Sequence, residues 1–352
     1  MADQMIAAVF HASADVRVEK LDIPTPVAGE VLVKVLRSGI CGTDASEYKS
    51  GPKMFPINAP HAMSGHVGPM VIGHEFIGEV IGQGTGGFNA GDLVASGAGI
   101  SCGKCVRCQQ GRTNLCDKYV TLGLNRHGGL AEYVCVPVST LVKIPAEMNL
   151  DAAGIAQPLA VGLHAARRSG AKDGDRVLLI GAGAIGTFVL TALKHLVNVE
   201  VAVMDFAGSR LERATRLGAD HTIDVGPTAT DRVKEFAAGG GIDVVIEASG
   251  APGQLQFAIE TVKRGGTILQ VGLPSAHQEI DVHKIVLSEI DIKTTLAHVC
   301  DEDLGVALEI LASSNLAAEL VEGVYPLSQI SHQLELLSTG KIQGKVLFDP
   351  SL

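Results

Sequence analysis

The pattern of apolar and polar positions changes once along the chain, near Asp175. Before that point, short apolar runs alternate with turns rich in glycine and proline, as in VLVKV (31–35), FIGEVIG (76–82) and AEYVCVPV (131–138). Runs of this length that are bounded by turn residues predict β-strands. The first part of the chain is therefore expected to form a mostly β domain.

From Asp175 onward the pattern alternates between strand and helix. RVLLIG precedes AIGTFVLTALKHL, VEVAVMD precedes SRLERATRLG, and further strands are expected at DVVIEA and GTILQVG. This alternation, at about 30 residues per unit, predicts a parallel, doubly wound sheet. After about Asp291 a helix (DLGVALEILASS) and a final strand (KVLFD) remain, and this tail is too short for a third domain.

We therefore predict an α/β protein in which a Rossmann domain is joined to a mostly β domain. The tail is expected to return to the first domain, so that both chain ends build it. The expected boundaries are 1–157 for the β domain, 158–293 for the Rossmann domain and 294–352 for the C-terminal return. A length of 352 residues agrees with two domains of roughly 150 residues each.

Composition and charge exclude several classes of protein. Apolar residues make up 46% of the chain and charged residues 19%, so a large core can form. The formal net charge is −10, whereas proteins that bind nucleic acid rely on basic residues, so we expect no nucleic-acid partner. The N-terminal residues lack a secretion signal and no apolar run reaches the ~18 residues of a membrane span. We expect a cytoplasmic protein with no membrane partner.

The glycines of GDRVLLIGAGAIG predict a dinucleotide site. Gly181, Gly183 and Gly186 follow a predicted strand and open a predicted helix, and Asp205 ends the next strand. Glycines in this spacing let the backbone approach a pyrophosphate, and the acid can hold the ribose hydroxyls. An acid at this position favours NAD over NADP, although nearby Arg210 leaves some room for the phosphate.

Four of the seven cysteines form a cluster in SCGKCVRCQQGRTNLC, namely Cys102, Cys105, Cys108 and Cys116. A disulfide staple, a zinc module that touches nucleic acid and a zinc-stiffened loop on an enzyme are all consistent with this spacing. An odd cysteine total and a reducing compartment argue against disulfides, because such cysteines bind metal more often than they pair. The acidic balance argues against the nucleic-acid module.

A second candidate metal site lies in GICGTD and VIGHEFIGEV. These segments supply Cys41, Thr43, Asp44, His74 and Glu75. Thiolate, imidazole and carboxylate are ligands that zinc prefers, and three protein ligands leave a position open for substrate. Each residue taken singly could equally be an ordinary buried thiol, core histidine or surface acid.

These motifs together resemble those of the zinc-dependent medium-chain alcohol and polyol dehydrogenases, and the resemblance extends over the whole chain. The matching motifs are Cys41-Gly42-Thr43-Asp44, Gly73-His74-Glu75 with Gly78, Gly91-Asp92, the four-cysteine cluster, Gly181-Ala182-Gly183-Ala184-Ile185-Gly186 and Val271-Gly272-Leu273. The resemblance implies a GroES-like catalytic domain beside the Rossmann domain. It also implies NAD as cofactor, two zinc ions per chain and assembly into a dimer or tetramer.

The resemblance also implies roles for single residues. Zinc held by Cys41 and His74 would lower the pKa of a substrate hydroxyl, while a hydride passes from the carbon that bears this hydroxyl to the nicotinamide. Thr43 would take the hydroxyl proton, and Asp44 would orient His74. The cofactor would contact Gly181, Gly183, Ala184, Ile185, Gly186, Asp205, Arg210, Val271, Gly272 and Leu273. Cys102, Cys105, Cys108 and Cys116 would hold the structural zinc.

Three positions depart from the family pattern. Ser46 stands where a relay histidine is common, so the proton must reach solvent by another group or by water. Gln157 stands where polyol dehydrogenases have an acid and simple alcohol dehydrogenases a cysteine, and either Gln157 or Glu75 could complete the zinc site. Ala297 and His298 replace the Arg-Tyr pair of sorbitol dehydrogenases, which puts sorbitol itself in doubt.

The long segment between Cys41 and His74 resembles that of the 2,3-butanediol (acetoin) dehydrogenases. In this interpretation Tyr48 lines the substrate pocket, while His61 and His66 belong to a solvated loop. We expect a small-molecule substrate, a vicinal diol or related secondary alcohol, that is oxidised reversibly to a ketone. The alternatives are a sugar or polyol dehydrogenase of the sorbitol or glucose type, then threonine dehydrogenase, and finally a non-enzymatic zinc-binding protein.

Overall fold

The computed structural model describes residues 3–352, and these divide into two compact units. Unit 1 runs to Gln157 and resumes at Val299–Leu352, whereas unit 2 comprises Pro158–His298. The expected boundary at 293/294 was placed too early, because it would cut through β16 (Asp291–Thr294), which pairs with its neighbouring strand in unit 2. No helix in residues 3–352 has the length and apolarity needed to cross a membrane.

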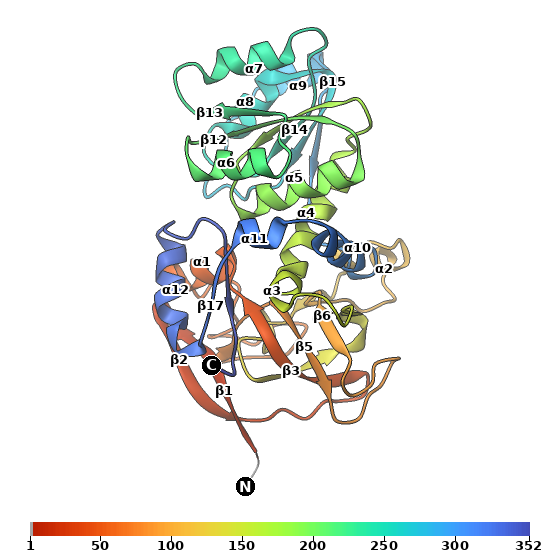
Figure 1. The fold of residues 1–352 in the computed structure, drawn as a ribbon, viewed down its shortest axis with the longest axis vertical. Helices are drawn as coiled ribbons and strands as arrows, with labels where there is room; N and C mark the ends of the chain where they lie inside the picture. Colours follow the sequence, from red (N-terminus) through yellow and green to blue (C-terminus); the bar gives the residue numbers. More distant parts are fainter. Residues whose placement is uncertain (1–2) are drawn as a thin grey trace. The chain divides into compact units, whose positions relative to one another are not determined.

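Unit 1 is built mainly from β-strands, as Figure 1 shows. Its largest sheet has seven strands in the order β10-β6-β5-β3-β18-β17, with β9 also pairing with β3; β2-β1-β4 and β7-β8 form two smaller sheets. The strands are β1 (Gln4–Ala12), β2 (Asp15–Asp22), β3 (Glu30–Gly39), β4 (Met70–Val71), β5 (Glu75–Ile81), β6 (Leu93–Ser96), β7 (Gly99–Ile100), β8 (Val120–Thr121), β9 (Tyr133–Pro137), β10 (Leu141–Lys143), β17 (Val321–Tyr325) and β18 (Lys345–Phe348).

The helices of unit 1 connect or flank these sheets, and all but α10 are short. They are α1 (Gly42–Ser50), α2 (Val106–Gln109), α3 (Leu150–Ala153), α10 (Cys300–Ser313), α11 (Leu316–Leu320) and α12 (Ile330–Ser338). Alternate residues of β3, namely Val31, Val33 and Val35, are buried in one core cluster, as expected for a strand with one face on the core.

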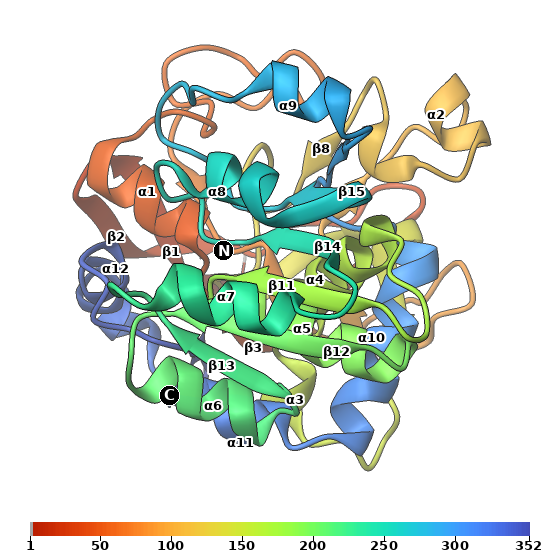
Figure 2. The ribbon, with the colours of Figure 1, turned by 90° about the horizontal axis from the view of Figure 1, so that it is seen from above.

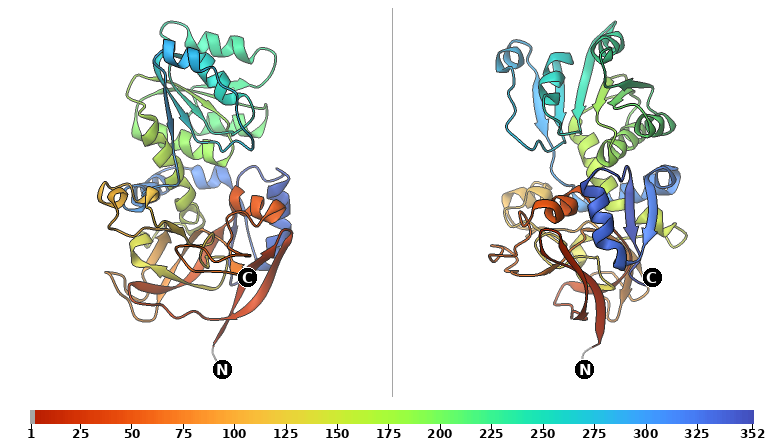
Figure 3. Two further views of the ribbon diagram at one scale, coloured as in Figure 1. Left: turned by 180° about the vertical axis from the view of Figure 1, so that it is seen from behind. Right: turned by 90° about the vertical axis from the view of Figure 1, so that its left-hand side faces the viewer.

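The C-terminal segment of the chain completes the large sheet of unit 1. Strand β18 pairs antiparallel with β3, through Leu347 opposite Gly39 and Phe348 opposite Ser38, and β17 lies parallel to β18. In Figure 3 the blue C-terminal strands lie in the same unit as the red N-terminal strands. All four residues of β18 are buried, so the tail is an internal part of this domain.

Unit 2 contains a six-stranded, fully parallel sheet in the order β13-β12-β11-β14-β15-β16. Its further strands are β11 (Arg176–Ile180), β12 (Glu200–Asp205), β13 (His221–Asp224), β14 (Ile242–Glu247) and β15 (Val262–Gln270). Its helices are α5 (Ala184–Leu196), α6 (Ser209–Arg216), α7 (Ala229–Ala237), α8 (Gln254–Thr261) and α9 (Val282–Leu287), and α4 (Ala156–Ser169) leads into the unit. Figure 2 shows β13, β12, β11, β14 and β15 side by side in this order.

The strand order of unit 2 reverses between β11 and β14. The chain moves outward from β11 through β12 to β13 and then returns to β14 on the other side of β11. Ligands of such sheets bind outside the carboxyl ends of the strands at this switch point. The predicted α/β class, with a Rossmann-type sheet and a mostly β domain built from both chain ends, is confirmed.

Candidate functional site: two metal-binding clusters and a dinucleotide turn

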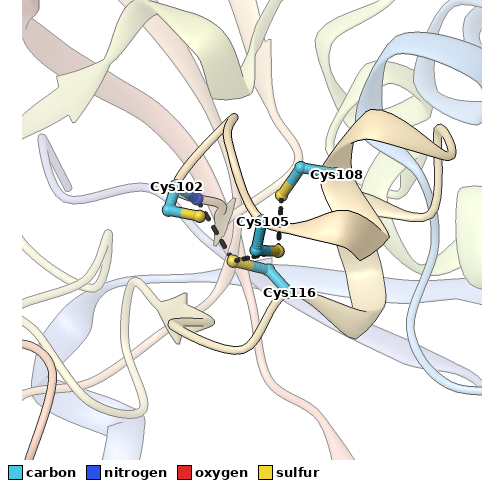
Figure 4. Close-up of side chains that lie close together, drawn as sticks. All are labelled: Cys102, Cys105, Cys108 and Cys116. Atoms are coloured by element: carbon cyan, nitrogen blue, oxygen red, sulfur yellow. Dashed lines mark hydrogen bonds between the residues drawn. The ribbon is translucent and has the colours of Figure 1, made fainter.

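The four cysteines of the cluster predicted in residues 101–116 lie together in unit 1. We call this segment the lobe. The four Sγ atoms are all within 4.8 Å of one another, and Figure 4 shows their side chains turned toward one another. The Sγ atom of Cys105 lies 3.5 Å from that of Cys108 and 3.9 Å from that of Cys116. A tetrahedral site made of four thiolates is closed and suits a structural zinc.

The lobe has few apolar contacts with which to hold its shape. Helix α2 has no buried residue, and Val106 at its start is exposed. Within 101–116 the buried residues are Asn114 and Cys116. A bound metal would therefore supply the cohesion that a hydrophobic core supplies elsewhere.

Backbone N–H groups in and next to the lobe favour the thiolate form of two of its cysteines, which is the form that binds a metal cation. Those of Asp117 and Cys108 donate to the thiol of Cys105 and lower its pKa to about 6. The pKa of Cys102 is also lowered, chiefly by the N–H groups of Lys104 and Cys105. Burial raises the pKa of Cys116 to about 11. Such N–H donors stabilise thiolates, which are the form that binds zinc.

The second cluster consists of Cys41, His74 and Glu75, which each offer one ligand atom within 4.8 Å of the others. Cys41 is the N-cap of α1, Glu75 is the first residue of β5, and His74 directly precedes it. His74 is 6% exposed and Glu75 is 1% exposed. The predicted donors sulfur, nitrogen and oxygen thus meet at a buried point of unit 1.

Asp44 lies beside this cluster, from the first turn of α1. Its Oδ2 atom accepts a hydrogen bond of 2.9 Å from the N–H of Cys41, while its Oδ1 atom lies 3.7 Å from Nδ1 of His74. Burial disfavours the charged imidazole, but the carboxylate of Asp44 and the thiol of Cys41 outweigh this and raise the pKa of His74 to about 10. Burial raises the pKa of Asp44, because it disfavours the charged carboxylate, and the nearby His74 offsets part of this rise.

Two atoms of this pair have no hydrogen-bond partner within the described chain, namely Oδ1 of Asp44 and Nδ1 of His74. Buried polar atoms are rarely left without a partner. A metal ion bound to the imidazole would fix the charge and the tautomer of His74. Nδ1 would then carry the proton and face the carboxylate oxygen of Asp44, so neither atom would be left without a role. The donor set and these two atoms fit a zinc ion.

Lys345 is a neighbour of this cluster that the sequence analysis missed. Its Nζ atom donates to a carboxylate oxygen of Glu75 and, at 2.8 Å, to the carbonyl of Ile40. Lys345 is the first residue of the buried strand β18 and is only 5% exposed, although it is a lysine. A lysine at the start of an otherwise apolar strand is a sequence signal for a buried partner, because lysine is almost never fully buried unless it is paired.

The remaining predicted residues of unit 1 take varied positions. Thr43 Oγ1 lies 4.0 Å from the Sγ atom of Cys41. Ser46 Oγ accepts a hydrogen bond of 2.9 Å from Nζ of Lys53. Gln157 is buried in the first turn of α4. Tyr48 packs partly buried against a core cluster.

The histidines of the long loop are partly enclosed rather than fully solvated. The main-chain N–H of His61 donates to the carbonyl of His66 at 2.9 Å. The ring of His66 lies edge-on to that of His127, with centroids 4.7 Å apart. The loop is therefore tied to the segment that carries His127.

In unit 2 the glycine-rich turn leads from β11 into α5, as predicted. Gly181 has φ of +98°, and Gly183 is the N-cap of α5, whose first residues are Ala184 and Ile185. A Cβ atom on Gly186 would lie 1.8 Å from the carbonyl oxygen of Gly181. Only glycine therefore allows this close approach of helix and strand.

Asp205 ends β12 next to this turn. Its Oδ2 atom accepts from the N–H of Ala182 at 2.6 Å and its Oδ1 atom from the N–H of Phe206 at 2.7 Å. Arg210 approaches the same carboxylate at 3.7 Å. A pocket of about 240 Å³ opens here, lined by residues that include Gly181, Asp205, Phe206, Arg210 and Ser249. Its position at the carboxyl ends of the strands fits the adenosine half of a dinucleotide.

Val271, Gly272 and Leu273 directly follow β15, at the same edge of the sheet. The N–H groups of Val271 and Gly272 both donate to the main-chain carbonyl of Glu247, each at 2.8 Å. Leu273 is 93% exposed. The segment that was predicted to face the nicotinamide is therefore held through its backbone.

Comparison with known proteins agrees with these features. The alcohol dehydrogenase GroES-like domain family matches residues 27–146, and the zinc-binding dehydrogenase family matches residues 184–313. An L-threonine 3-dehydrogenase from Shewanella sp. (strain W3-18-1) is 32% identical over 335 residues, which are 93% of this chain and 94% of that protein.

Solved structures show the same similarity. The 2R,3R-butanediol dehydrogenase from Bacillus subtilis superposes with a TM-score of 0.89 at 30% identity, over 98% of this chain and 99% of that chain. An alcohol dehydrogenase from E. coli CFT073, in complex with NADH, reaches 0.87 at 28% identity, over 99% of this chain and 100% of that chain. The expected family is thereby confirmed: the chain belongs to the zinc-dependent medium-chain alcohol and polyol dehydrogenases.

Proposed function

We propose that the protein is a zinc-dependent, NAD(H)-linked dehydrogenase that reversibly oxidises a secondary alcohol to a ketone, with a vicinal diol of the 2,3-butanediol type as preferred substrate. The observation that carries the proposal is the cluster of the half-buried Cys41 with the buried His74 and Glu75, whose three different donor atoms lie within 4.8 Å of one another. Thiolate, imidazole and carboxylate are the donors of catalytic zinc sites, which keep one position open.

Zinc, when bound, would act as a Lewis acid that lowers the pKa of the substrate hydroxyl, and NAD would accept the hydride. Cys41 and His74 would hold the metal. Asp44 would fix the orientation and charge of the His74 ring, from which it is 3.7 Å away. Thr43, 4.0 Å from the Cys41 sulfur, would take the hydroxyl proton.

Glu75 would serve as a carboxylate that either completes the metal site or stays with Lys345. The two side chains form a buried ion pair. A buried carboxylate that lost this partner would be costly, so the lysine stabilises Glu75 whenever it is not bound to metal. Whether Gln157 instead completes the site is tested by a substitution described in the Discussion.

We infer that the cofactor is NAD rather than NADP. The carboxylate of Asp205 lies beside the glycine-rich turn, where its Oδ2 atom accepts from the N–H of Ala182, and a carboxylate at this position repels a 2′-phosphate. Arg210 lies close enough to this carboxylate to offset part of its charge. The ratio of kcat/KM for NAD and NADP measures the net effect, and equal values would contradict the inference.

A second substrate candidate is L-threonine, since the curated relatives at 32% identity are L-threonine 3-dehydrogenases. In both candidates the carbon next to the secondary hydroxyl carries a polar group, a hydroxyl in the diol and an ammonium in threonine, so the same metal cluster could act on either. They differ in charge, because threonine needs partners for an ammonium and a carboxylate whereas a diol needs only neutral hydrogen-bond partners.

The experiment that tests the proposal is an assay of NADH formation by the zinc-loaded protein. The panel contains the three stereoisomers of 2,3-butanediol, L-threonine, sorbitol and glucose, with the His74→Ala variant as a control for metal-dependent turnover. A butanediol with the highest kcat/KM supports the proposal. Preference for L-threonine would move the substrate to the second candidate, and no turnover of any alcohol would overturn the function itself.

We also infer that the chain forms a homo-oligomer. Strand β16 is at the end of the parallel sheet of unit 2. Apolar side chains on and near it are exposed, namely Val282, Val286, Leu287, Ile292 and Leu296. Exposed apolar patches on soluble domains commonly mark interfaces. Sedimentation velocity decides between a dimer or tetramer and a monomer, and a monomer would contradict the inference.

A further inference from the structure

Glu247 is a buried carboxylate at the carboxyl end of β14 for which the proposed chemistry has no use. It is 1% exposed. Its Oε1 atom accepts from the N–H of Ser249 at 2.8 Å, from the hydroxyl of the same serine and from the N–H of Gly250 at 3.0 Å. Its Oε2 atom accepts from the side-chain amide of Gln270 and lies 3.1 Å from the N–H of Gly250.

These contacts join two loops that leave neighbouring strands. Ser249 and Gly250 belong to the loop after β14, and Gln270 is the last residue of β15. The side-chain amide of Gln270 also donates to the carbonyl of Gly272 at 2.6 Å. The main-chain carbonyl of Glu247 accepts from the N–H groups of Val271 and Gly272. Its side chain reaches the segment 271–273 indirectly, through the amide of Gln270.

The two loops touch so closely that glycine is required at their contact. A Cβ atom on Gly272 would lie 2.1 Å from the nitrogen of Gly250 and 2.8 Å from Oε2 of Glu247. Burial does not fix this segment, since Val271 and Gly272 are half-buried and Leu273 is exposed. Hydrogen bonds to Glu247 and Gln270 must therefore determine its position.

We propose that Glu247 is a positioning residue for the nicotinamide end of the cofactor. It acts by holding the backbone of 271–273 in the place where, in the proposed function, this segment would contact the ring. The inference rests on the proposed dinucleotide function and adds to it a residue that touches no substrate. The adenosine end, at Asp205 and the glycine turn, has its own hydrogen bonds, and of the residues that Glu247 holds only Ser249 lines its pocket, so we expect it to depend on Glu247 much less.

The charge and acceptor character of Glu247 are both needed. All the groups around its side chain are donors, so a carboxylate with two acceptor atoms satisfies them. Glu247→Gln has nearly the same shape but replaces one acceptor by an NH₂ group. This group would place a donor against either the N–H of Gly250 or the amide of Gln270. One of the hydrogen bonds that join the two loops would then be lost.

The test compares binding of NADH with binding of ADP-ribose, which lacks the nicotinamide, by calorimetry on the zinc-loaded protein. For Glu247→Gln we expect the Kd of NADH to rise roughly tenfold or more, as for the loss of a charged hydrogen bond, and that of ADP-ribose to change less than about twofold. Glu260→Gln is the matched control, because Glu260 is exposed on α8 and its side chain accepts from that of Gln256. It should change neither value.

A second variant guards against loss of fold. Gln270→Met keeps the side-chain volume and removes the amide that bridges Glu247 and Gly272, so it should weaken NADH binding selectively as well. Parallel weakening of NADH and ADP-ribose in both variants would show a general structural role and overturn the inference. Unchanged NADH binding would overturn it too. If the wild-type protein binds neither compound, the proposed function fails and the inference fails with it.

Discussion

The two cysteine-containing clusters of unit 1 differ in what surrounds them. The lobe repeats one donor type four times, in a segment with almost no core, and its thiols receive hydrogen bonds from backbone N–H groups. The second cluster combines three donor types in a buried place, and its His74 and Glu75 each have a charged neighbour, Asp44 and Lys345. Uniform, backbone-supported donors suit a metal that holds a fold, whereas individually tuned donors suit a metal that takes part in a reaction.

The largest expected effect is on turnover. His74→Ala should lower kcat by roughly a thousandfold or more, because the metal's Lewis acidity supplies several kcal/mol of transition-state stabilisation. The zinc content should fall from two ions to one per chain, as measured by atomic emission, while the circular dichroism spectrum stays unchanged. A variant that keeps two zinc ions would show that His74 is no ligand.

The next effect concerns stability around the buried ion pair. Lys345→Met leaves Glu75 without its ammonium partner in a buried place. Removal of one partner from a buried pair typically costs about 3–5 kcal/mol. Urea unfolding of the metal-free protein measures it, and the double variant with Glu75→Gln should recover much of the loss. Additive losses in the double variant would mean that the two side chains do not interact.

The lobe should respond in structure rather than in chemistry. Cys105→Ser should release one zinc ion, speed hydrogen exchange across residues 101–116 and lower Tm by roughly 5 °C. Some turnover should survive. With the wild-type protein, a mild chelator should abolish activity before the lobe metal leaves, since the four-thiolate site is closed. Loss of the lobe metal first would reverse the assignment of the two sites.

The metal-free protein should also show opposite pH dependence at the two clusters. Burial lowers the pKa of His74, but Asp44 and Cys41 together raise it to about 10, above the ordinary 6.5. The stabilisation is therefore fully present below pH 6.5 and is lost as the pH rises through about 10. For Cys105 the pKa of about 6 lies below the ordinary 9.0, so its contribution is present above pH 9 and is lost as the pH falls through 6.

The difference in unfolding midpoint between wild type and His74→Asn isolates the first contribution. We expect this difference to shrink between pH 7 and pH 10 in metal-free protein. The same comparison with Cys105→Ser should give a difference that grows over pH 6 to 9. If both differences run in the same direction, the two clusters do not differ in the way their surroundings indicate.

The smallest effect is expected from Gln157→Glu. If Gln157 coordinates the catalytic zinc, a carboxylate there lowers the net charge at the metal by one unit, so zinc should be held more tightly and the pH profile of alcohol oxidation should shift upward. Equilibrium zinc competition and a pH–rate profile measure the two changes. If both stay unchanged while substrate preference moves, Gln157 is a substrate contact.

The sequence predicted those features that are local along the chain. The spacing of the lobe cysteines, the glycine turn with Asp205 and the change from β to β–α–β texture each lie within one short window, and periodicity and turn chemistry are visible there. The pairing of Lys345 with Glu75 was missed because the residues are 270 positions apart. Glu247 was missed because a single acid at a strand end gives no signal until the facing loop is known.

The boundary after unit 2 shows a similar limit. The pattern loosens near Asp291, which made residue 293 a reasonable end for the Rossmann domain. The structure shows instead that Asp291–Thr294 forms β16, paired with β15. A four-residue edge strand with little apolar content carries almost no periodic signal.

The insertion of β18 beside β3 has a consequence for the order in which the protein is made. Unit 2 is contiguous, Pro158–His298, and can form its sheet while synthesis continues. Unit 1 cannot be completed until residues 345–348 have been translated. Before that, its large sheet lacks the internal strand β18, and Glu75 lacks its partner Lys345. We therefore expect nascent chains released before residue 345 to contain a folded dinucleotide-binding unit and an incomplete first unit whose exposed β3 edge invites chaperones or aggregation.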